Sequence, residues 1–273
     1  ATIPVEGYAH NAWTNESGNI LITTEETENK TIKIWDISDF NNIILIGEYL
    51  GENGLAHNVH IKNDLAYISH YTTGLKIIDF FDPSKPVEIA AFDTYSENDN
   101  GGFYGCWGAY PFTNNNYIYA SDMQNGLYIF NFNEIHAGWA NGTIFYNQNV
   151  PLANASIKST LNNKIFYSNE LGQFSIGFPE GSHEFIINES DTIIIDFLPH
   201  ETIEENFVIG NTLMPGDVNQ DSNLDILDII IIINIILDTY SPNIEEIWAS
   251  DINGDNNINI QDIILLIQFI LNL

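Results

Sequence analysis

The chain contains no arginine and a single cysteine, and both absences limit what it can be. Of its 273 residues, seven are basic, all of them lysine, and 37 are acidic, so the formal net charge is −30. A surface this acidic excludes electrostatic binding to nucleic acid or to an anionic membrane, because both require a positive surface that displaces counterions. The lone Cys106 excludes an intramolecular disulfide and a cysteine-rich zinc site.

Other common signals are missing as well. No run of 18 or more uncharged apolar residues occurs, so the sequence predicts no membrane-spanning helix. The opening ATIPVEGYAH has neither the basic nor the apolar part of a signal peptide, and we expect the chain to be the C-terminal fragment of a longer protein. No GxSxG, HExxH, P-loop or GxGxxG context is present, so we expect no enzyme. The 44% of apolar residues nevertheless suffices for packed cores.

A repeat with a period of 47 to 50 residues occupies the first half of the chain. AHNAW at 9–13 returns as AHNVH at 56–60 and, with Trp107 in place of His57, as GCWGAY at 105–110. Short alternating apolar runs separated by Gly, Asn, Asp and Pro follow each copy, which is typical of antiparallel strands. At this period they predict about three β-propeller blades in residues 1–135. The expected strands include 20–23, 32–38, 43–49, 65–69, 74–80, 87–93, 117–121 and 126–132.

These blades resemble a known family. The strings HNVHIKNDLAYISHYTTGLKIIDFFDPSKPVEIAAF and CWGAYPFTNNNYIYASDMQNGLYIF are similar to the LVIVD-repeat propeller of bacterial surface proteins called choice-of-anchor B. The resemblance implies a recognition face for a glycan or protein ligand. Closed propellers have roughly 4–8 blades, so we expect this one to be incomplete.

Four histidines in the repeats, His10, His57, His60 and His70, could suggest a metal site. His57 and His60 are three residues apart, and on a strand such positions face opposite sides. Because a metal site needs three or more converging ligands, we favour a structural role in which His10 and His57 satisfy buried backbone groups. Three further polar residues recur by position and are interpreted as turn or strand-end hydrogen-bonding groups: Asp36, Asp79 and Asn131.

Residues 140–209 predict a small β-sandwich. Alternating runs are separated by turn signals at 147–149, 162–163, 170–172 and 179–181. The segment resembles the carboxypeptidase regulatory-like, or transthyretin-like, domain through Gly142–Ile144, Pro151–Ile157, Gly172–Ile176 and Pro179–Gly181. That resemblance implies a non-catalytic appended module.

The strongest pattern lies at the C-terminus, where GDVNQDSNLDILDIIIIINIIL at 216–237 is repeated 34 residues later as SDINGDNNINIQDIILLIQFIL. Polar residues at positions 1, 3, 5, 9 and 12, with a backbone carbonyl at 7, form the oxygen ladder of a 12-residue Ca²⁺ loop. After Lys164 the chain has 19 acidic residues and no Lys or Arg, which also favours a bound cation. Two ions are expected. The predicted ligands are Asp217, Asn219, Asp221, Asn223, Asp225 and Asp228, then Asp251, Asn253, Asp255, Asn257, Asn259 and Asp262.

Residues 212–273 resemble a type I dockerin, with two loop–helix motifs joined by a linker at 238–249 that fits a short helix. The β-branched run 229–233 favours a strand by propensity, but its symmetry with the second copy predicts a helix. The resemblance implies docking to a cohesin. Loop positions 10 and 11 are Ile226–Leu227 and Ile260–Gln261. They predict an apolar contact surface for a cohesin-like or other surface protein, or alternatively packing against residues 140–209.

The sequence therefore predicts a multidomain, mostly β protein. Partial β-propeller blades come first, then a small β-sandwich, then an α-helical dockerin-like pair of Ca²⁺ loop–helix motifs. The favoured function is a non-catalytic, bacterial, secreted or cell-surface modular protein with a calcium-dependent tail. The alternative is a component of an extracellular polysaccharide-degrading system, accessory to or a fragment of a glycoside hydrolase.

Overall fold

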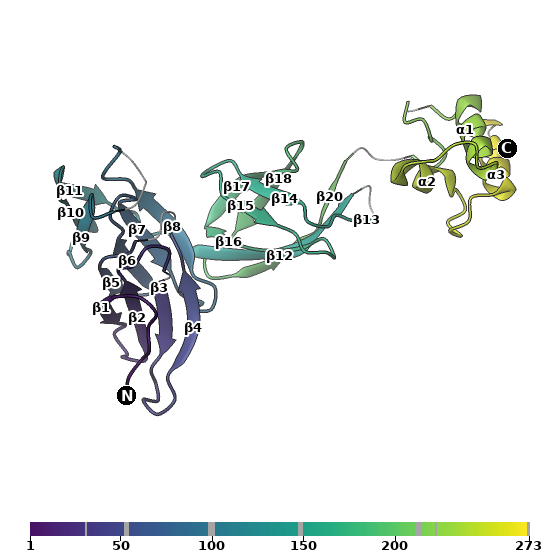
Figure 1. Ribbon diagram of the computed structural model, residues 1–273. Helices are drawn as coiled ribbons and strands as arrows, with labels where there is room; N and C mark the ends of the chain where they lie inside the picture. Colours follow the sequence, from purple (N-terminus) through teal and green to yellow (C-terminus); the bar gives the residue numbers. More distant parts are fainter. Residues whose placement is uncertain are drawn as a thin grey trace. The chain divides into compact units, whose positions relative to one another are not determined.

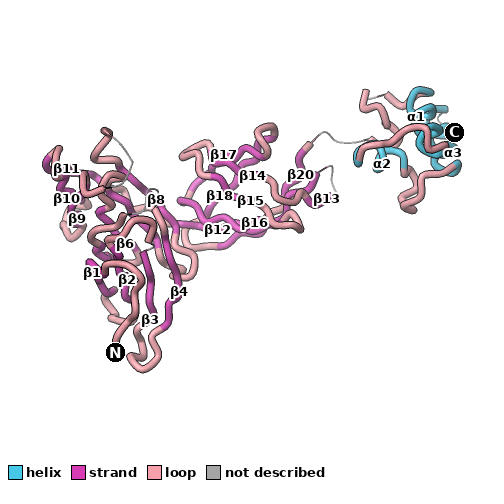
Figure 2. Tube along the Cα trace, viewed as in Figure 1, coloured by secondary structure: helices cyan, strands magenta, loops and turns pink. Residues whose placement is uncertain are grey.

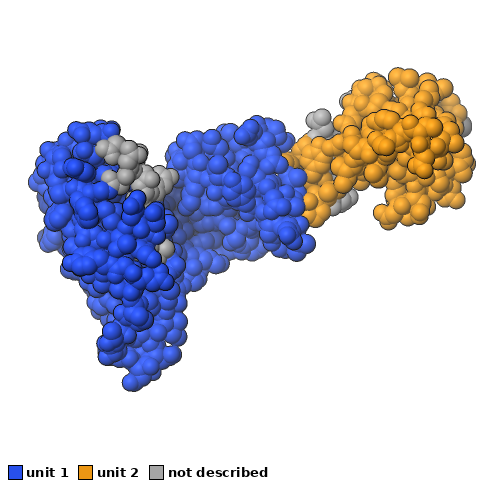
Figure 3. Space-filling model, viewed as in Figure 1, with its two compact units in different colours: residues 1–144, 152–207 blue, residues 145–151, 208–273 orange. Residues whose placement is uncertain are grey.

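The computed structural model describes residues 1–30, 32–51, 55–97, 102–146, 150–210, 214–221 and 223–271. Within these ranges the chain forms 20 strands and three helices, and all three helices follow residue 225 (Figures 1 and 2). The mostly β class expected from the sequence is confirmed. The described residues fall into two compact units, one of residues 1–144 with 152–207 and one of residues 145–151 with 208–273 (Figure 3).

Residues 9–131 form three consecutive antiparallel sheets, one for each copy of the repeat. The expected strands are confirmed, and the segments AHNAW, AHNVH and GCWGAY lead into or form one further strand in each sheet. The first sheet holds β1 (Ala9–Thr14), β2 (Ile20–Glu25), β3 (Ile32–Asp36) and β4 (Ile44–Tyr49) in that order. The second holds β5 (Val59–Lys62), β6 (Leu65–Ser69), β7 (Leu75–Asp79) and β8 (Val87–Phe92). The third holds β9 (Cys106–Tyr110), β10 (Tyr117–Asp122) and β11 (Gly126–Asn131).

Aspartates end the repeated strands. The Ser38 amide donates to the Asp36 side chain at 2.9 Å, and the Phe81 amide donates to Asp79 at 2.8 Å. A carboxylate that binds the amide two residues later stabilises a turn, as the sequence predicted for Asp36 and Asp79.

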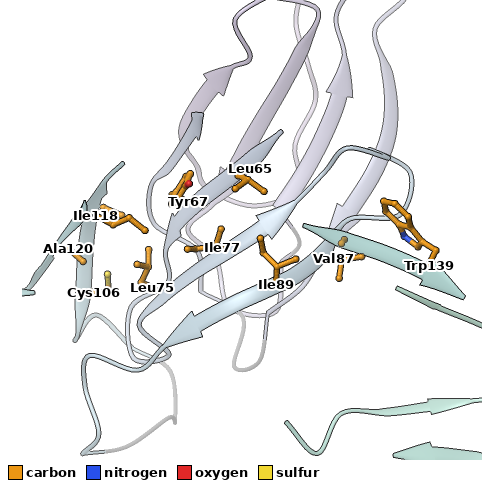
Figure 4. Close-up of a cluster of buried hydrophobic side chains, with 12 residues drawn as sticks. Leu65, Tyr67, Leu75, Ile77, Val87, Ile89, Cys106, Ile118, Ala120 and Trp139 are labelled. Atoms are coloured by element: carbon orange, nitrogen blue, oxygen red, sulfur yellow. The ribbon is translucent and has the colours of Figure 1, made fainter. Parts of the chain in front are cut away.

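Two hydrophobic clusters hold the three sheets together. Ile22 and Ile34 of the first sheet pack with Val59, Ile68 and Ile78 of the second. The side chains on the opposite face of the second sheet join those of the third in another cluster, which Trp139 of the following strand extends (Figure 4). Each buried aliphatic side chain contributes about 1.5–3 kcal/mol relative to exposure, so these clusters fix the order of the sheets.

Cys106 is fully buried in the second cluster, where burial raises the pKa of its thiol to about 12. A thiol of this kind stays protonated at neutral pH and is a packing residue rather than a nucleophile.

Two more sheets follow in residues 137–209. One contains β12 (Ala137–Tyr146), β13 (Val150–Pro151), β16 (Gln173–Pro179), β19 (Thr202–Glu204) and β20 (Phe207–Ile209). The other contains β14 (Ser156–Ser159), β15 (Ile165–Tyr167), β17 (Gly181–Ile187) and β18 (Asp191–Phe197). They pack through aromatic rings, since Phe178 lies 5.2 Å from Phe185 and 5.7 Å from Phe197 between ring centroids. The turn predicted at 147–149 lies outside the described residues.

The C-terminal unit contains helices α1 (Ile226–Ile236), α2 (Ile244–Ser250) and α3 (Ile260–Leu271). The β-branched run 229–233 is helical, as the internal symmetry predicted, and α2 lies in the predicted linker. Asp225 and Asp228 form a capping box at the start of α1, which offsets the weak helix propensity of the isoleucines. None of the helices in the described ranges has the length and apolarity needed to cross a membrane.

Candidate functional site

The first predicted calcium loop, residues 217–228, is organised by its own polar side chains. The Asp221 amide donates to Asp217 at 3.1 Å and to Asn219 at 3.0 Å, and the Asn223 amide donates to Asp221 at 2.8 Å. The carboxylate and amide oxygens at positions 1, 3 and 5 therefore turn toward the interior of the loop. The bond from the Asn223 amide also lowers the pKa of Asp221 and keeps this carboxyl anionic.

The second loop, residues 251–262, repeats this arrangement 34 residues later. The Asp255 amide donates to Asp251 at 3.1 Å and to Asn253 at 2.9 Å, and the Asn257 amide donates to Asp255 at 2.8 Å. Asp225 and Asn259, the position-9 residues, both accept a hydrogen bond from the amide two residues later. The internal repeat of the sequence is thus also a repeat of the hydrogen-bond pattern.

The position-12 aspartates, Asp228 and Asp262, are the most buried members of the set, and both are 0% exposed. One Asp228 oxygen accepts from the Val218 and Asn219 amides at 2.8 and 3.1 Å, and the other accepts from the Asp225 amide at 3.0 Å. Asp262 makes the same three bonds, from the amides of residues 252, 253 and 259. Each carboxylate therefore joins the two ends of its loop at the start of a helix.

Tight reversals of the backbone close the loops. Position 4 has a left-handed conformation in both copies, with φ of 59° at Gln220 and 71° at Gly254. Asn256 at position 6 of the second loop has φ of 62°. Asparagine and glycine tolerate this region better than other residues do, which explains Gly254 and Asn256 in the second loop. Ser222, the position-6 residue of the first loop, lies outside the described residues.

A small hydrophobic cluster unites the two halves. Val218 of the first loop packs with Ile232 of α1, Ala249 of α2, and Ile263 and Leu266 of α3. The Gly216 amide also donates to the Ala249 carbonyl at 2.9 Å. Because one core serves both loops, a change in one loop is expected to affect the other.

The donor set matches a hard divalent cation. All the predicted side-chain ligands offer carboxylate or amide oxygens, and calcium binds 6–8 such oxygens. Residues 214–271 contain ten acidic residues and no Lys or Arg, so no basic side chain of this segment can neutralise them. These residues fit a Ca²⁺ ion well.

Loop positions 10 and 11 lie at the surface. Ile226 is 67% exposed and Ile260 is 61% exposed, and the side chains of Leu227 and Gln261 are exposed as well. Large apolar side chains at corresponding exposed positions of both motifs form a two-part apolar surface beside the loops.

The four histidines of the repeats lie in three different surroundings. The rings of His10, His57 and Trp107, which occupy equivalent positions of the three copies, stack in a row with 4.2 Å between successive centroids. The His60 ring lies instead beside Trp13 and Phe112, so the two histidines of HNVH do not converge. His70 is buried and bonded to Thr73, and burial lowers its pKa to about 3.

Two clusters of titratable side chains were missed by the sequence analysis. Glu26 lies beside His10 and His57, although residues 73 and 123, the equivalent positions of the later copies, are Thr and Met. In the other cluster, the fully buried Asp79 has His136 and His200 each 3.3 Å from one of its oxygens. No sequence spacing connects these residues, because tertiary packing alone brings them together.

Family models match two segments of the chain. Residues 215–271 match the dockerin type I domain, and residues 53–94 match the LVIVD repeat, which corresponds to the second sheet. The resemblances to these two modules are thereby confirmed. Neither module is catalytic, and dockerin domains are calcium-binding modules of extracellular or cell-surface proteins that bind cohesin partners. No curated protein sequence matches the chain.

The comparison with solved structures gives matches at very low sequence identity and low TM-score. The computationally designed Ika4 protein is 8% identical with a TM-score of 0.36, over 72% of this chain and 96% of its own. A putative 6-phosphogluconolactonase from Bacteroides fragilis is 8% identical with a TM-score of 0.38, over 68% of this chain and 56% of its own. The WD40 β-propeller domain of Doa1 is 10% identical with a TM-score of 0.33, over 71% and 58%.

Proposed function

We propose that the C-terminal segment binds two Ca²⁺ ions and, when loaded, docks to a cohesin-type protein. The observation that carries the proposal is the repeat of one hydrogen-bond pattern in two acidic loops, each closed by a fully buried aspartate. Such a pattern holds many anionic oxygens close together, and a divalent cation relieves their repulsion. Calcium binding would then be a condition for the fold of the docking surface.

Each predicted ligand has a distinct task in this proposal. The side chains at positions 1, 3 and 5 supply oxygens, position 7 supplies its backbone carbonyl, and position 9 acts directly or through water. The buried position-12 aspartates connect the ion to the start of the helix. The proposed ligands are Asp217, Asn219, Asp221, Asn223, Asp225 and Asp228 for one ion, and Asp251, Asn253, Asp255, Asn257, Asn259 and Asp262 for the other.

The docking surface in this proposal is the apolar pair of patches at positions 10 and 11. Exposed Ile226, Leu227 and Ile260 offer area that a partner can bury, while the surrounding acids repel an acidic partner. We infer a partner with an apolar patch bordered by Lys or Arg. The full chain is then a non-catalytic, secreted or cell-surface bacterial protein, in which the β-propeller blades of residues 1–135 recognise a glycan or protein and residues 140–209 act as a spacer.

Binding of a purified type I cohesin to the intact chain, measured with calcium and with chelator, tests this proposal. We expect binding only with calcium, and we expect the double variant Ile226→Ser/Ile260→Ser to lose it while keeping its calcium-dependent helicity. Ile244→Ser, at an exposed position of α2, is the matched control and should bind normally. Equal cohesin binding by the double variant, or binding that persists in chelator, contradicts the proposal.

A further inference from the structure

Three side chains far apart in the sequence converge where the first two sheets meet. His10 comes from β1, Glu26 follows β2 directly, and His57 lies in the loop before β5. One nitrogen of each histidine and one carboxylate oxygen of Glu26 all lie within 4.8 Å of one another. His10 Nδ1 is 3.1 Å from Glu26 Oε2, and His57 Nε2 is 4.0 Å from Glu26 Oε1.

The hydrogen bond of His57 determines which nitrogen faces this cluster. His57 Nδ1 lies 2.5 Å from the Trp107 carbonyl oxygen, and a carbonyl can only accept, so Nδ1 carries the proton. In the neutral ring, Nε2 then presents a bare lone pair toward Glu26. A backbone carbonyl on the far nitrogen is the usual arrangement for a histidine that binds a metal.

His57 Nε2 is an orphaned group. The side chain is 2% exposed, and Nε2 has no hydrogen-bond partner among the described residues. A buried acceptor without a partner is destabilising, because it has lost its hydrogen bonds to water. Here the lone pair also faces a carboxylate oxygen, so the two groups repel each other unless a cation lies between them.

A proton on His57 Nε2 would supply that positive charge, but burial disfavours it. Burial is the largest effect and lowers the pKa of His57; the hydrogen bond to the Trp107 carbonyl and the charge of Glu26 oppose it, and His10 acts with it. Burial therefore favours the neutral ring, which is the form that ligates metals.

The position of Glu26 is fixed by a further contact. The hydroxyl of Tyr71, a fully buried residue, donates to Glu26 Oε1. This bond holds the carboxylate toward the two rings and leaves its remaining lone pairs available. A hydrogen-bonded carboxylate is the common form of such a ligand in metal sites.

We propose that His10, Glu26 and His57 bind a divalent transition-metal ion of the zinc class. Two imidazoles and one carboxylate suit Zn²⁺ rather than Ca²⁺, which prefers oxygen ligands alone. Tetrahedral coordination with bonds of about 2.0–2.1 Å places ligand atoms about 3.3 Å apart. The His10–Glu26 separation of 3.1 Å is close to this value, and the His57–Glu26 separation of 4.0 Å would shorten when an ion binds. Three protein ligands leave one coordination position for water or another ligand, and the ion would connect the first two sheets.

The Asp79 cluster is a weaker candidate for the same chemistry. The ring nitrogens of His136 and His200 both lie within ion-pair distance of Asp79, and the Ala137 amide also donates to this carboxylate at 2.9 Å. Mutual contacts account for this cluster without an added ion.

Zinc titration of the intact chain, with calcium at saturating concentration so that the acidic loops are occupied, tests the proposal. We expect one strong Zn²⁺ equivalent, and Co²⁺ in its place should give the visible absorption bands of a four- or five-coordinate site. Glu26→Gln and His10→Ala should weaken binding by about 10-fold or more, and His57→Ala should abolish it. His10 is partly exposed, so its variant should fold even if His57→Ala does not.

Two variants serve as controls. His60→Ala removes a half-buried histidine whose Nδ1 has no partner in the described structure but which lies among aromatic rings, and it should bind zinc normally. His136→Gln tests the Asp79 cluster and should also leave the strong equivalent unchanged. Absence of the cobalt bands in the unmodified chain, or loss of the strong equivalent in His136→Gln but not in His10→Ala and Glu26→Gln, overturns the proposal.

Discussion

Asp228 and Asp262 combine two tasks that ordinarily fall to different residues. Each accepts three backbone amides that would otherwise be unpaired, and each is a proposed ligand. The three amide donors supply hydrogen bonds that a fully buried carboxylate would otherwise lack. Aspartate is shorter than the glutamate usual at this position. It still reaches the amides at both ends of the loop, because the loop leads directly into the helix.

Removing one of these carboxylates should destabilise the C-terminal unit. With calcium present, Asp228→Ala leaves three amide donors without a partner and should lower the free energy of unfolding by about 2–4 kcal/mol. Urea denaturation followed by the helical circular dichroism signal measures this. Asp238→Asn, an exposed change outside the loops, should stay within about 0.5 kcal/mol of the unmodified chain. Equal stability of both variants contradicts the structural role of Asp228.

The burial of His70 predicts that the stability of the N-terminal unit, residues 1–144 with 152–207, depends on pH. Burial lowers its pKa from the ordinary 6.5 to about 3, so below about pH 6.5 the unfolded chain binds a proton that the folded chain does not. Stability from this group is therefore full above pH 6.5 and falls as the pH drops toward 3, by at most about 1.4 kcal/mol per pH unit. His57 and His60, whose pKa values burial also lowers, act in the same direction.

Urea unfolding of the N-terminal unit at pH 7 and pH 5 measures this effect. The free energy of unfolding should fall between these values, and His70→Gln should make the fall smaller. The prediction fails if His70→Gln unfolds with the same pH dependence as the unmodified chain.

Helix α1 has an apolar sequence on all sides but buries only part of it. Ile232 is fully buried against α3 and the first loop, whereas Ile230, two residues earlier, is 48% exposed. The helix is therefore held by a narrow face and by its capping aspartates rather than by the propensity of its residues.

This difference gives a direct comparison within one helix. Ile232→Ala should lower the free energy of unfolding of the calcium-loaded unit by about 2–4 kcal/mol, because it opens a cavity in a small core. Ile230→Ala changes the same residue type at an exposed position and should cost about 0.5 kcal/mol or less. Thermal or urea denaturation with calcium present measures both, and similar losses would contradict the packing of α1.

Most of the elements that the sequence predicted lie in internal repeats. The blade strands and the loop–helix pair recur at fixed offsets, so each copy supports the assignment of the others, and symmetry even predicted a helix for the β-branched run 229–233. The cluster at Glu26 was not predictable, because neither later copy of the repeat has an acidic residue there. The pairing of Asp79 with His136 and His200, up to 121 residues away, was not predictable either, because only tertiary packing brings these residues together.

The molecule as a whole divides its charge unevenly between its two compact units. All seven lysines lie at or before residue 164, where several are paired, as Lys33 is with Glu25 at 2.5 Å. The C-terminal segment has no basic side chain, and its core is small. Calcium is therefore the expected source of its stability: an ion present at 1,000 times its dissociation constant contributes about 4 kcal/mol per site.

A calcium titration of the intact chain after removal of metal by chelator tests the central claim most directly. Isothermal calorimetry should give two Ca²⁺ ions per chain, and the helical circular dichroism signal should rise with them while the β signal of the N-terminal unit stays constant. Asp217→Ala and Asp251→Ala should each leave one, weaker site, because the two loops share a core. A chain that binds no calcium, or whose helices are equally formed in chelator, would contradict the account.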